Sequence, residues 1–208
     1  MGQMYIAANL SKREYLDPFR LGGTTKLGEI FGSRGFAGLL SVALAIPDWS
    51  VAEHPFVGRW AGDQVILVGD FMDWGYVSHL IEEGRVDLPS WIINELKEGY
   101  IPPEEGEDEF SYRRRVRQMG GMPTLYSLVK KHFRDISVEA IKFLYREYPK
   151  EGLKAALYIL GDYKSGLIGP EYVLELLEDE EIYRVLQQEM GEELQRILSR
   201  IKRSNFGR

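Results

Sequence analysis

The sequence has no cysteine and only three histidines among its 208 residues. The lack of cysteine excludes disulfides, thiolate metal ligands and cysteine nucleophiles. It is typical of a reducing compartment, and we expect a cytoplasmic location. Because His54, His79 and His132 stand apart in the sequence, we expect no metal and no cofactor. Asn and Gln are also scarce, and charged residues reach 28%, a composition typical of proteins from hot environments.

Long hydrophobic runs are missing as well. The longest apolar stretch, residues 35–46, has about half the length of a membrane span, and we predict a buried helix there. The N-terminus lacks the basic and apolar regions of a secretory signal. We therefore expect no membrane partner.

The net charge of −6 is unevenly distributed. Residues 1–103 carry 8 Lys and Arg against 13 Asp and Glu, whereas residues 104–208 carry 18 against 19. An acidic balance argues against duplex nucleic acid as an obligatory partner. The basic cluster Arg113–Arg117 indicates either nucleic-acid contact or pairing with the acidic run at 104–109. The local balance favours pairing, so nucleic acid is an open but disfavoured partner.

The N-terminal half predicts a small β-sheet with helices packed on it. Residues 4–10 and 13–17 flank a polar dipeptide and predict a hairpin. The apolar run 64–68 predicts a central strand with Ile66 and Val68 buried. Residues 76–83 and 89–97 predict short helices, and residues 101–109 predict a loop.

From about residue 110 onward the chain is predicted to be helical. Ser137 and Pro170 are placed to start helices. The last helix carries apolar residues from Ile182 to Ile201 on one face, which either docks on its own domain or forms a homodimer seam. The fold class is thus α+β with a helical C-terminal half. We predict a core domain at 1–148 and a helical extension at 149–208 packed on it.

Segment 58–75 places two Gly-Asp pairs around the predicted strand. Asp70 and Asp73 at the strand end resemble the Gly-Asp-x-x-Asp element of calcineurin-like metallophosphatases. The histidines that accompany this element there are missing, and the favoured interpretation is that Asp63 and Asp70 cap turns at the two strand ends. Seven residues of strand separate Asp63 from Asp70 by roughly 23 Å, so these two cannot act on one atom.

Two glycine-rich stretches contain residues typical of phosphate loops. Residues 22–26 lack the spacing of a phosphate loop, and residues 32–38 lack the dinucleotide-binding order. Backbone amides at a helix start could still bind an anion. Close backbone packing beside a buried helix is the favoured explanation.

Arg59, Trp60 and Asp63 directly precede the predicted strand. Loops at strand ends often carry function, and an exposed tryptophan would indicate a partner or ligand. If Trp60 is instead buried, with Arg59 stacked on it and paired to Asp63, the cluster is a structural clasp. Both interpretations stay open at this point.

Several segments together resemble a family of small proteins from bacteria, archaea and their viruses. Its members open with Met-Gly-Gln and carry Trp-Ala-Gly-Asp before a strand ending in Gly-Asp-Tyr. The matching parts here are the opening residues 1–5, the hairpin at 9–18, the segment 58–70, with Phe71 in place of the tyrosine, and residues 125–137. The family has no assigned activity. The resemblance covers residues 1–145 and implies an insertion at about 98–122.

These observations favour a binding or interaction protein over an enzyme. A protein partner or a homodimer is expected, and the resemblance admits a viral, host-modulating role. The binding candidates are Arg59, Trp60, Asp63, Asp70 and Asp73. The alternative is a phosphate-handling enzyme or nucleotide-binding protein that uses segment 58–75.

Overall fold

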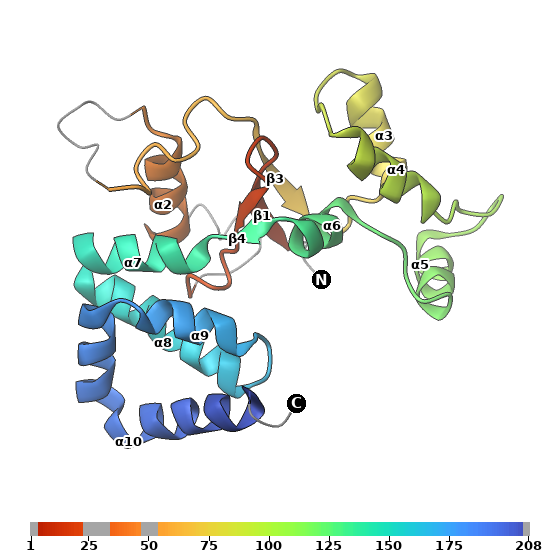
Figure 1. Ribbon diagram of the computed structural model, residues 1–208. Coiled ribbons are helices and arrows are strands. Elements are labelled where there is room, and N and C mark those ends of the chain that lie inside the picture. Colours follow the sequence, from red (N-terminus) through yellow and green to blue (C-terminus); the bar gives the residue numbers. More distant parts are fainter. Residues whose placement is uncertain (1–3, 23–33, 47–53, 206–208) are drawn as a thin grey trace. The chain divides into compact units, whose positions relative to one another are not determined.

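The computed structural model describes residues 4–22, 34–46 and 54–205 of the chain (Figure 1). It confirms the α+β class, with a four-stranded N-terminal sheet and a helical C-terminal half. Within these ranges, no helix combines the length and the apolar character needed to cross a membrane. The strands are β1 (Tyr5–Asn9), β2 (Glu14–Leu16), β3 (Val65–Gly69) and β4 (Arg134–Asp135). The helices are α2 (Arg34–Leu44), α3 (Trp74–Glu82), α4 (Ser90–Glu98), α5 (Glu109–Gln118), α6 (Leu125–His132), α7 (Ser137–Glu147), α8 (Pro149–Lys164), α9 (Pro170–Leu177) and α10 (Glu180–Asn205).

The chain divides into two compact units whose segments alternate along the sequence. The described residues 4–16 and 62–135 form the first unit, which holds the sheet and helices α3 to α6. Residues 17–22, 34–46, 54–61 and 136–205 form the second unit, which is helical. The boundary predicted at 148 falls inside the second unit, between α7 and α8.

The sheet of the first unit has the strand order β3-β1-β2-β4. The predicted hairpin is confirmed: β1 and β2 are antiparallel, with Ala8 opposite Tyr15. Strand β1 also pairs antiparallel with β3, with Ile6 opposite Val68. The last strand, β4, pairs parallel with β2. The two inner positions therefore belong to β1 and β2, each of which pairs on both sides, and β3 lies at one edge.

The prediction that residues 64–68 form a central strand is wrong in its position. Strand β3 is real, but it lies at the edge of the sheet among the described residues. Val68 is fully buried, whereas Ile66 is only half-buried. An apolar run on both faces normally indicates a central strand. In β3 the two faces are apolar for different reasons. Helices cover the face that carries Val68, and Leu67 lines a hollow of the surface.

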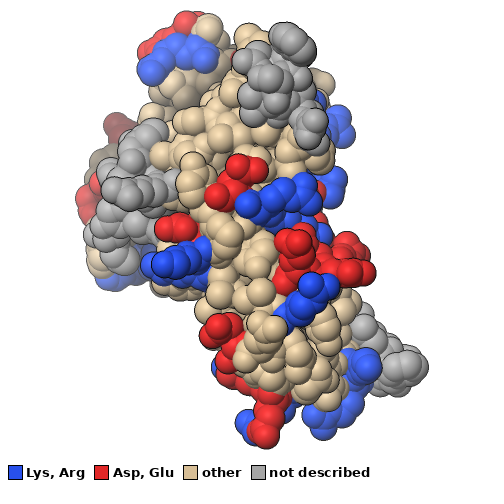
Figure 2. Space-filling model, turned by 90° about the vertical axis from the view of Figure 1, so that its left-hand side faces the viewer, with Lys and Arg blue, Asp and Glu red and all other residues tan. Residues whose placement is uncertain are grey.

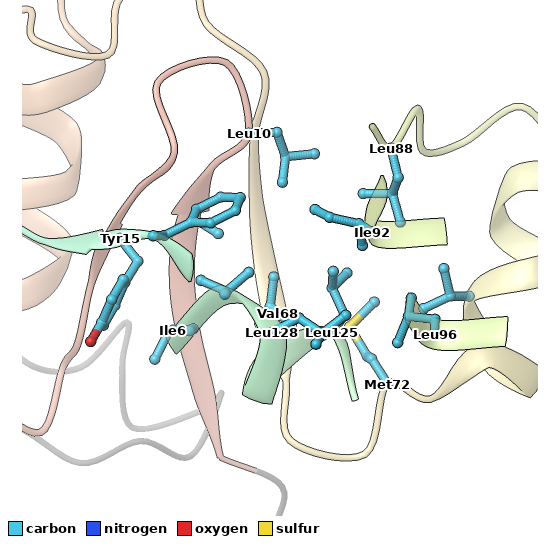
Figure 3. Packing of buried hydrophobic residues seen from close by; sticks show 14 residues of the cluster. Ile6, Leu10, Tyr15, Val68, Met72, Leu88, Ile92, Leu96, Leu125 and Leu128 are labelled. Atoms are coloured by element: carbon cyan, nitrogen blue, oxygen red, sulfur yellow. The ribbon is translucent and has the colours of Figure 1, made fainter. Parts of the chain in front are cut away.

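The core of the first unit lies between one sheet face and helices α3, α4 and α6. Alternation in the strands points Ile6, Ala8 and Val68 to the same side. Figure 3 shows Val68 and Met72 beside the leucines of α6 and α4. Each fully buried aliphatic side chain contributes about 1.5–3 kcal/mol. The helical residues in this cluster are Val77, Ile92, Leu96, Leu125, Leu128 and Val129.

Helices α7 and α8 of the second unit meet at a tight corner. A Cβ atom added to Gly152 would lie 2.2 Å from the Cα atom of Tyr145. Real Cβ atoms do not approach a backbone that closely, so only glycine fits at this position. The start of α9 at Pro170 is as predicted, because proline suits the first turn of a helix.

The final helix, α10, docks on its own unit, as the default interpretation predicted. Its apolar stripe is buried at Ile182, Leu186, Leu194, Ile197 and Ile201. The backbone leaves the helical conformation at Gly191, and Figure 1 shows two helical arms joined at a bend. The bend lets both arms present the same stripe to α8 and α9.

Ser137 does not cap α7, which corrects the prediction. Helix α7 begins at Ser137 itself, and the preceding Ile136 offers no capping side chain. The buried hydroxyl of Ser137 instead accepts a hydrogen bond from the backbone N–H of Asp17 (3.0 Å). Nearby, Arg20 forms a buried ion pair with Asp162 (2.9 Å). Both contacts attach residues 17–22 to the helices of the second unit.

Candidate functional site

Trp60 is fully buried in the second unit. Its backbone N–H donates to the Ala43 carbonyl oxygen (2.7 Å), and that of Gly58 donates to Val42 (3.0 Å). These bonds attach residues 58–60 to the last turn of α2, whose final carbonyls lack partners within the helix. The burial of Trp60 leaves its ring no surface to offer a partner. Arg59, beside it, belongs to the same unit and is half-buried.

Asp63 belongs to the first unit and binds the turn of the β1–β2 hairpin. Its carboxylate accepts a hydrogen bond from the Asn9 side chain (2.7 Å) and pairs with Lys12 (3.0 Å). The Asn9 bond, followed by Lys12, holds the pKa of Asp63 below its usual range. The adjacent Gln64 N–H donates to Ser11 Oγ (3.1 Å). Asp63 thus closes a turn at the start of β3.

Asp70 and Asp73 follow the other end of β3. Asp70 accepts a hydrogen bond from the backbone N–H of Met4 (3.0 Å). Asp73 is the N-cap of α3 and accepts from the N–H of Tyr76 (3.0 Å), a contact that satisfies one of the free donors at the helix start. The two aspartates therefore have structural partners, and they also line one hollow of the surface.

The described residues hold no group of three or more His, Asp or Glu side chains placed to bind a metal ion. The histidines remain separated, with His132 beside Glu95 (3.1 Å) and His79 near Glu82 (3.8 Å). Of the two glycine-rich stretches, residues 23–26 and 32–33 lie outside the described residues, whereas residues 34–38 belong to the first turns of α2.

A hollow of about 320 Å³ lies between the β3–α3 turn and α5 in the first unit. Asp70, Phe71 and Asp73 line it from the turn. Tyr112, Arg113 and other residues of α5 line it from the helix. Two further hollows share Arg113: one of about 390 Å³ along α5 and one of about 640 Å³ beside β3. Arg113 therefore stands where three depressions of the surface meet.

Three consecutive arginines of α5 each lie over an aromatic ring. The Arg113 guanidinium is 4.5 Å from the ring centroid of Phe71, and that of Arg114 is 4.8 Å from Phe110. Arg115 lies 5.7 Å from the ring of Tyr112. Such contacts are worth about 0.5–1 kcal/mol at exposed sites. They keep the arginines against the surface of the first unit.

The acidic run upstream pairs with two of these three arginines, as the favoured interpretation predicted. Arg115 contacts Glu107 (2.7 Å) and Glu104 (3.5 Å), and Arg113 contacts Glu109 (2.5 Å). The Arg115 bond holds the pKa of Glu107 below its usual range. Arg117 is exposed and has no hydrogen bond or ion pair within the described part of the chain. Arg114, which lies over Phe110, likewise has no ion pair among the described residues, so Arg114 and Arg117 are the members of the cluster whose charges are not compensated.

Tyr112 anchors α5 to the loop before it. Its hydroxyl donates to the Ile101 carbonyl oxygen (2.8 Å). Burial, with the negative charge of Asp73 adding to it, raises the pKa of Tyr112 to about 12. Tyr112 therefore stays protonated at neutral pH and serves as a hydrogen-bond donor.

Large apolar side chains are exposed around the same hollows. Phe71 is 44% exposed, Tyr76 57% and Phe110 69%. We call this surface the α5 face and define it by Phe71, Tyr76, Phe110, Arg113, Arg114 and Arg117. In the view of Figure 2, acidic and basic side chains lie close together rather than in separate fields.

The sequence interpretation missed the α5 face. It took Arg113–Arg117 as one cluster and Asp70 and Asp73 as part of another. One signal was available: Val116 is the only aliphatic residue of segment 109–118, which also holds two aromatic residues and four arginines.

No protein-family model, curated protein or solved structure matches this chain.

Proposed function

We propose that this chain is a cytoplasmic binding protein that takes a protein partner on the α5 face. The observation that carries the proposal is the mixture of exposed aromatic rings and arginines around three connected hollows. Aromatic residues and arginine are enriched in protein interfaces, and they dominate the binding energy there. A surface of this composition supports protein binding.

The arginines are already ordered over aromatic rings before a partner arrives. Arg113 lies on Phe71 and is paired with Glu109. A side chain that is fixed in advance loses less conformational entropy on binding. The exposed pair with Glu109 adds little stability, so a partner's carboxylate can replace Glu109 at small cost.

A nucleotide is the second candidate ligand. Phe110, Arg113, Arg114 and Arg117 line one hollow, and an aromatic ring beside cations suits a base and its phosphates. The exposed rings of Phe71 and Tyr76 extend over the neighbouring hollow. This wider apolar surface favours a macromolecular partner over a single nucleotide.

The proposal is tested by using the full chain as bait in extracts of cells that express it. Phe110→Ala and Arg117→Glu are compared with Glu98→Ala, a change at an exposed residue that lines none of the hollows. We expect both α5-face variants to lower recovery of the same partner protein by more than about tenfold. The control retains it.

Two outcomes contradict the proposal: no protein enriched by the wild-type chain, or equal recovery by all variants. A titration with ATP tests the second candidate. Saturable binding of ATP that is lost in Arg117→Glu, without a protein partner, establishes the nucleotide interpretation instead.

A further inference from the structure

The outer edge of β3 has free backbone hydrogen-bonding groups. Toward β1, the Leu10 N–H donates to Gln64 and the Asp70 N–H donates to Met4, both at 2.9 Å. Antiparallel strands alternate between residues that bond inward and residues that bond outward. The N–H and C=O groups of Val65 and Leu67 therefore point away from β1. Within the described residues these groups have no partner.

A hollow of about 640 Å³ follows this edge. Ile66 and Leu67 both line it, although successive side chains of a strand point to opposite faces of the sheet. A hollow that both residues reach must open along the edge of the strand. Side chains of α3 and of the segment after it also line the hollow, including Tyr76, Leu80 and Val86.

The edge lacks the usual protection against strand pairing. Exposed edges are commonly interrupted by charged residues, prolines or bulges. From Val65 to Gly69 strand β3 contains none of these. The opposite edge of the sheet, β4, is only two residues long, and both residues are charged. Only the β3 edge is open, long and apolar among the described strands.

The charges around the hollow favour an acidic occupant. Arg85 and Arg113 line it, against one carboxylate, Asp73, which is engaged as the cap of α3. Arg85 and Arg113 have exposed partners outside the lining, Glu83 and Glu109. Such exposed pairs are weak, and a carboxylate that enters the hollow competes with them.

We propose that β3 accepts an extended segment of a partner protein as an additional antiparallel strand. The segment carries apolar side chains at alternating positions and acidic residues between them. Its backbone bonds to Val65 and Leu67, its apolar side chains enter the hollow, and its carboxylates face Arg85 and Arg113. Strand addition of this kind takes affinity from main-chain bonds and specificity from side-chain pockets. This inference rests on the proposed function and names the chemistry of its partner.

The test uses the full chain and a synthetic acetylated and amidated peptide of seven residues in which glutamate and valine alternate. We expect saturable binding and strong slowing of hydrogen exchange at the Val65 and Leu67 amides. The same peptide with methylated backbone nitrogens keeps its side chains but cannot donate hydrogen bonds, and it should bind at least about tenfold more weakly.

Two substitutions at one position separate main-chain from side-chain effects. Leu67→Pro removes the outward N–H, which makes no bond inside the sheet, so an edge strand tolerates it. Leu67→Ala removes the side chain and keeps the N–H. We expect Leu67→Pro to weaken peptide binding about tenfold or more and Leu67→Ala clearly less. If Leu67→Pro does not fold, the methylated peptide and the exchange data decide alone.

Several results overturn the inference: no saturable binding at about 1 mM peptide, unchanged exchange at Val65 and Leu67, or equal loss in both variants. If these amides are protected from exchange without peptide, and the protection increases with protein concentration, the edge binds a second copy of this chain instead. Failure here is distinct from failure of the proposed function. If Phe110→Ala loses the cellular partner while Leu67→Pro keeps it, the α5 face binds without strand addition.

Discussion

The guanidinium of Arg113 lies 4.5 Å from the centre of the Phe71 ring. Phe71 follows β3 and Arg113 is in α5, so this contact joins the sheet to a helix that buries only Val116. Because α5 has little apolar anchorage, its position depends on arginine contacts. The shape of the α5 face therefore depends on this pair.

A double-mutant cycle tests this dependence. Arg113→Ala, Phe71→Ala and the double variant should show a coupling energy of about 0.5–1 kcal/mol. The measurement is amide hydrogen exchange in α5, which reports local opening of that helix. Arg113→Lys serves as the control and should retain part of the coupling. If the effects of the two single substitutions add up to the effect of the double variant, the contact does not hold α5 in place.

Trp60→Ala should destabilise the second unit by about 3–5 kcal/mol, because the ring is fully buried. Leu167→Ala, at a side chain that is 60% exposed, should change stability by no more than about 0.5 kcal/mol. Thermal and urea unfolding measure both variants. Unchanged stability of Trp60→Ala, with loss of partner binding, would instead support a binding role for Trp60.

Two glycines of α8 provide a matched pair. Gly152→Ala places a Cβ atom 2.2 Å from the Tyr145 Cα atom and should cost about 1–3 kcal/mol or more as overpacking. Gly161→Ala meets nothing within 4 Å and should stabilise the helix by about 0.5–1 kcal/mol. Opposite shifts in melting temperature are expected. Equal shifts would show that the α7–α8 corner is looser than described.

The Asp63 contacts predict a pH-dependent stability. The pKa of Asp63 in the folded chain lies below its usual value of 3.8, so between these two values the unfolded chain binds more protons. The stabilisation is therefore complete above the usual value and is lost as the pH falls through the folded pKa. Urea unfolding of wild type and Asp63→Asn should differ at neutral pH and converge in acid. If the two proteins still differ in stability at acid pH, the difference does not come from the charge of Asp63.

The hairpin and most helices could be predicted because local signals determine them. A polar dipeptide between two apolar runs specified β1 and β2, and Pro170 marked the start of α9. The place of β3 in the sheet depends on which strands pair, and the residues 65–69 themselves do not contain that information. Similarly, serine is a common helix cap, but the hydroxyl of the buried Ser137 accepts a hydrogen bond from the backbone N–H of Asp17 instead. That contact depends on the tertiary structure.

The α5 face was harder to predict because its parts are distant in sequence. Phe71 and Arg113 meet only once the sheet and α5 are both in place. The pairing of Arg115 with Glu104 and Glu107 was predictable, since the acidic run directly precedes the helix. Whether an aromatic ring is exposed depends on the folded surface. The sequence led us to consider exposure for Trp60, which is buried, and not for the rings of the α5 face.

The alternation of the two units along the chain has a consequence for biosynthesis. Strand β2 needs β4, at Arg134–Asp135, to complete the sheet. While residues 17–61 are being made, the hairpin at 5–16 has neither β3 nor β4 to pair with, because residues 65–69 and 134–135 have yet to be synthesised. The described parts of residues 17–61 belong to the second unit and in turn need α7 and α8, which they contact. The nascent chain thus carries unpaired strand edges and apolar segments through most of its synthesis, a period in which chaperone contact protects such surfaces.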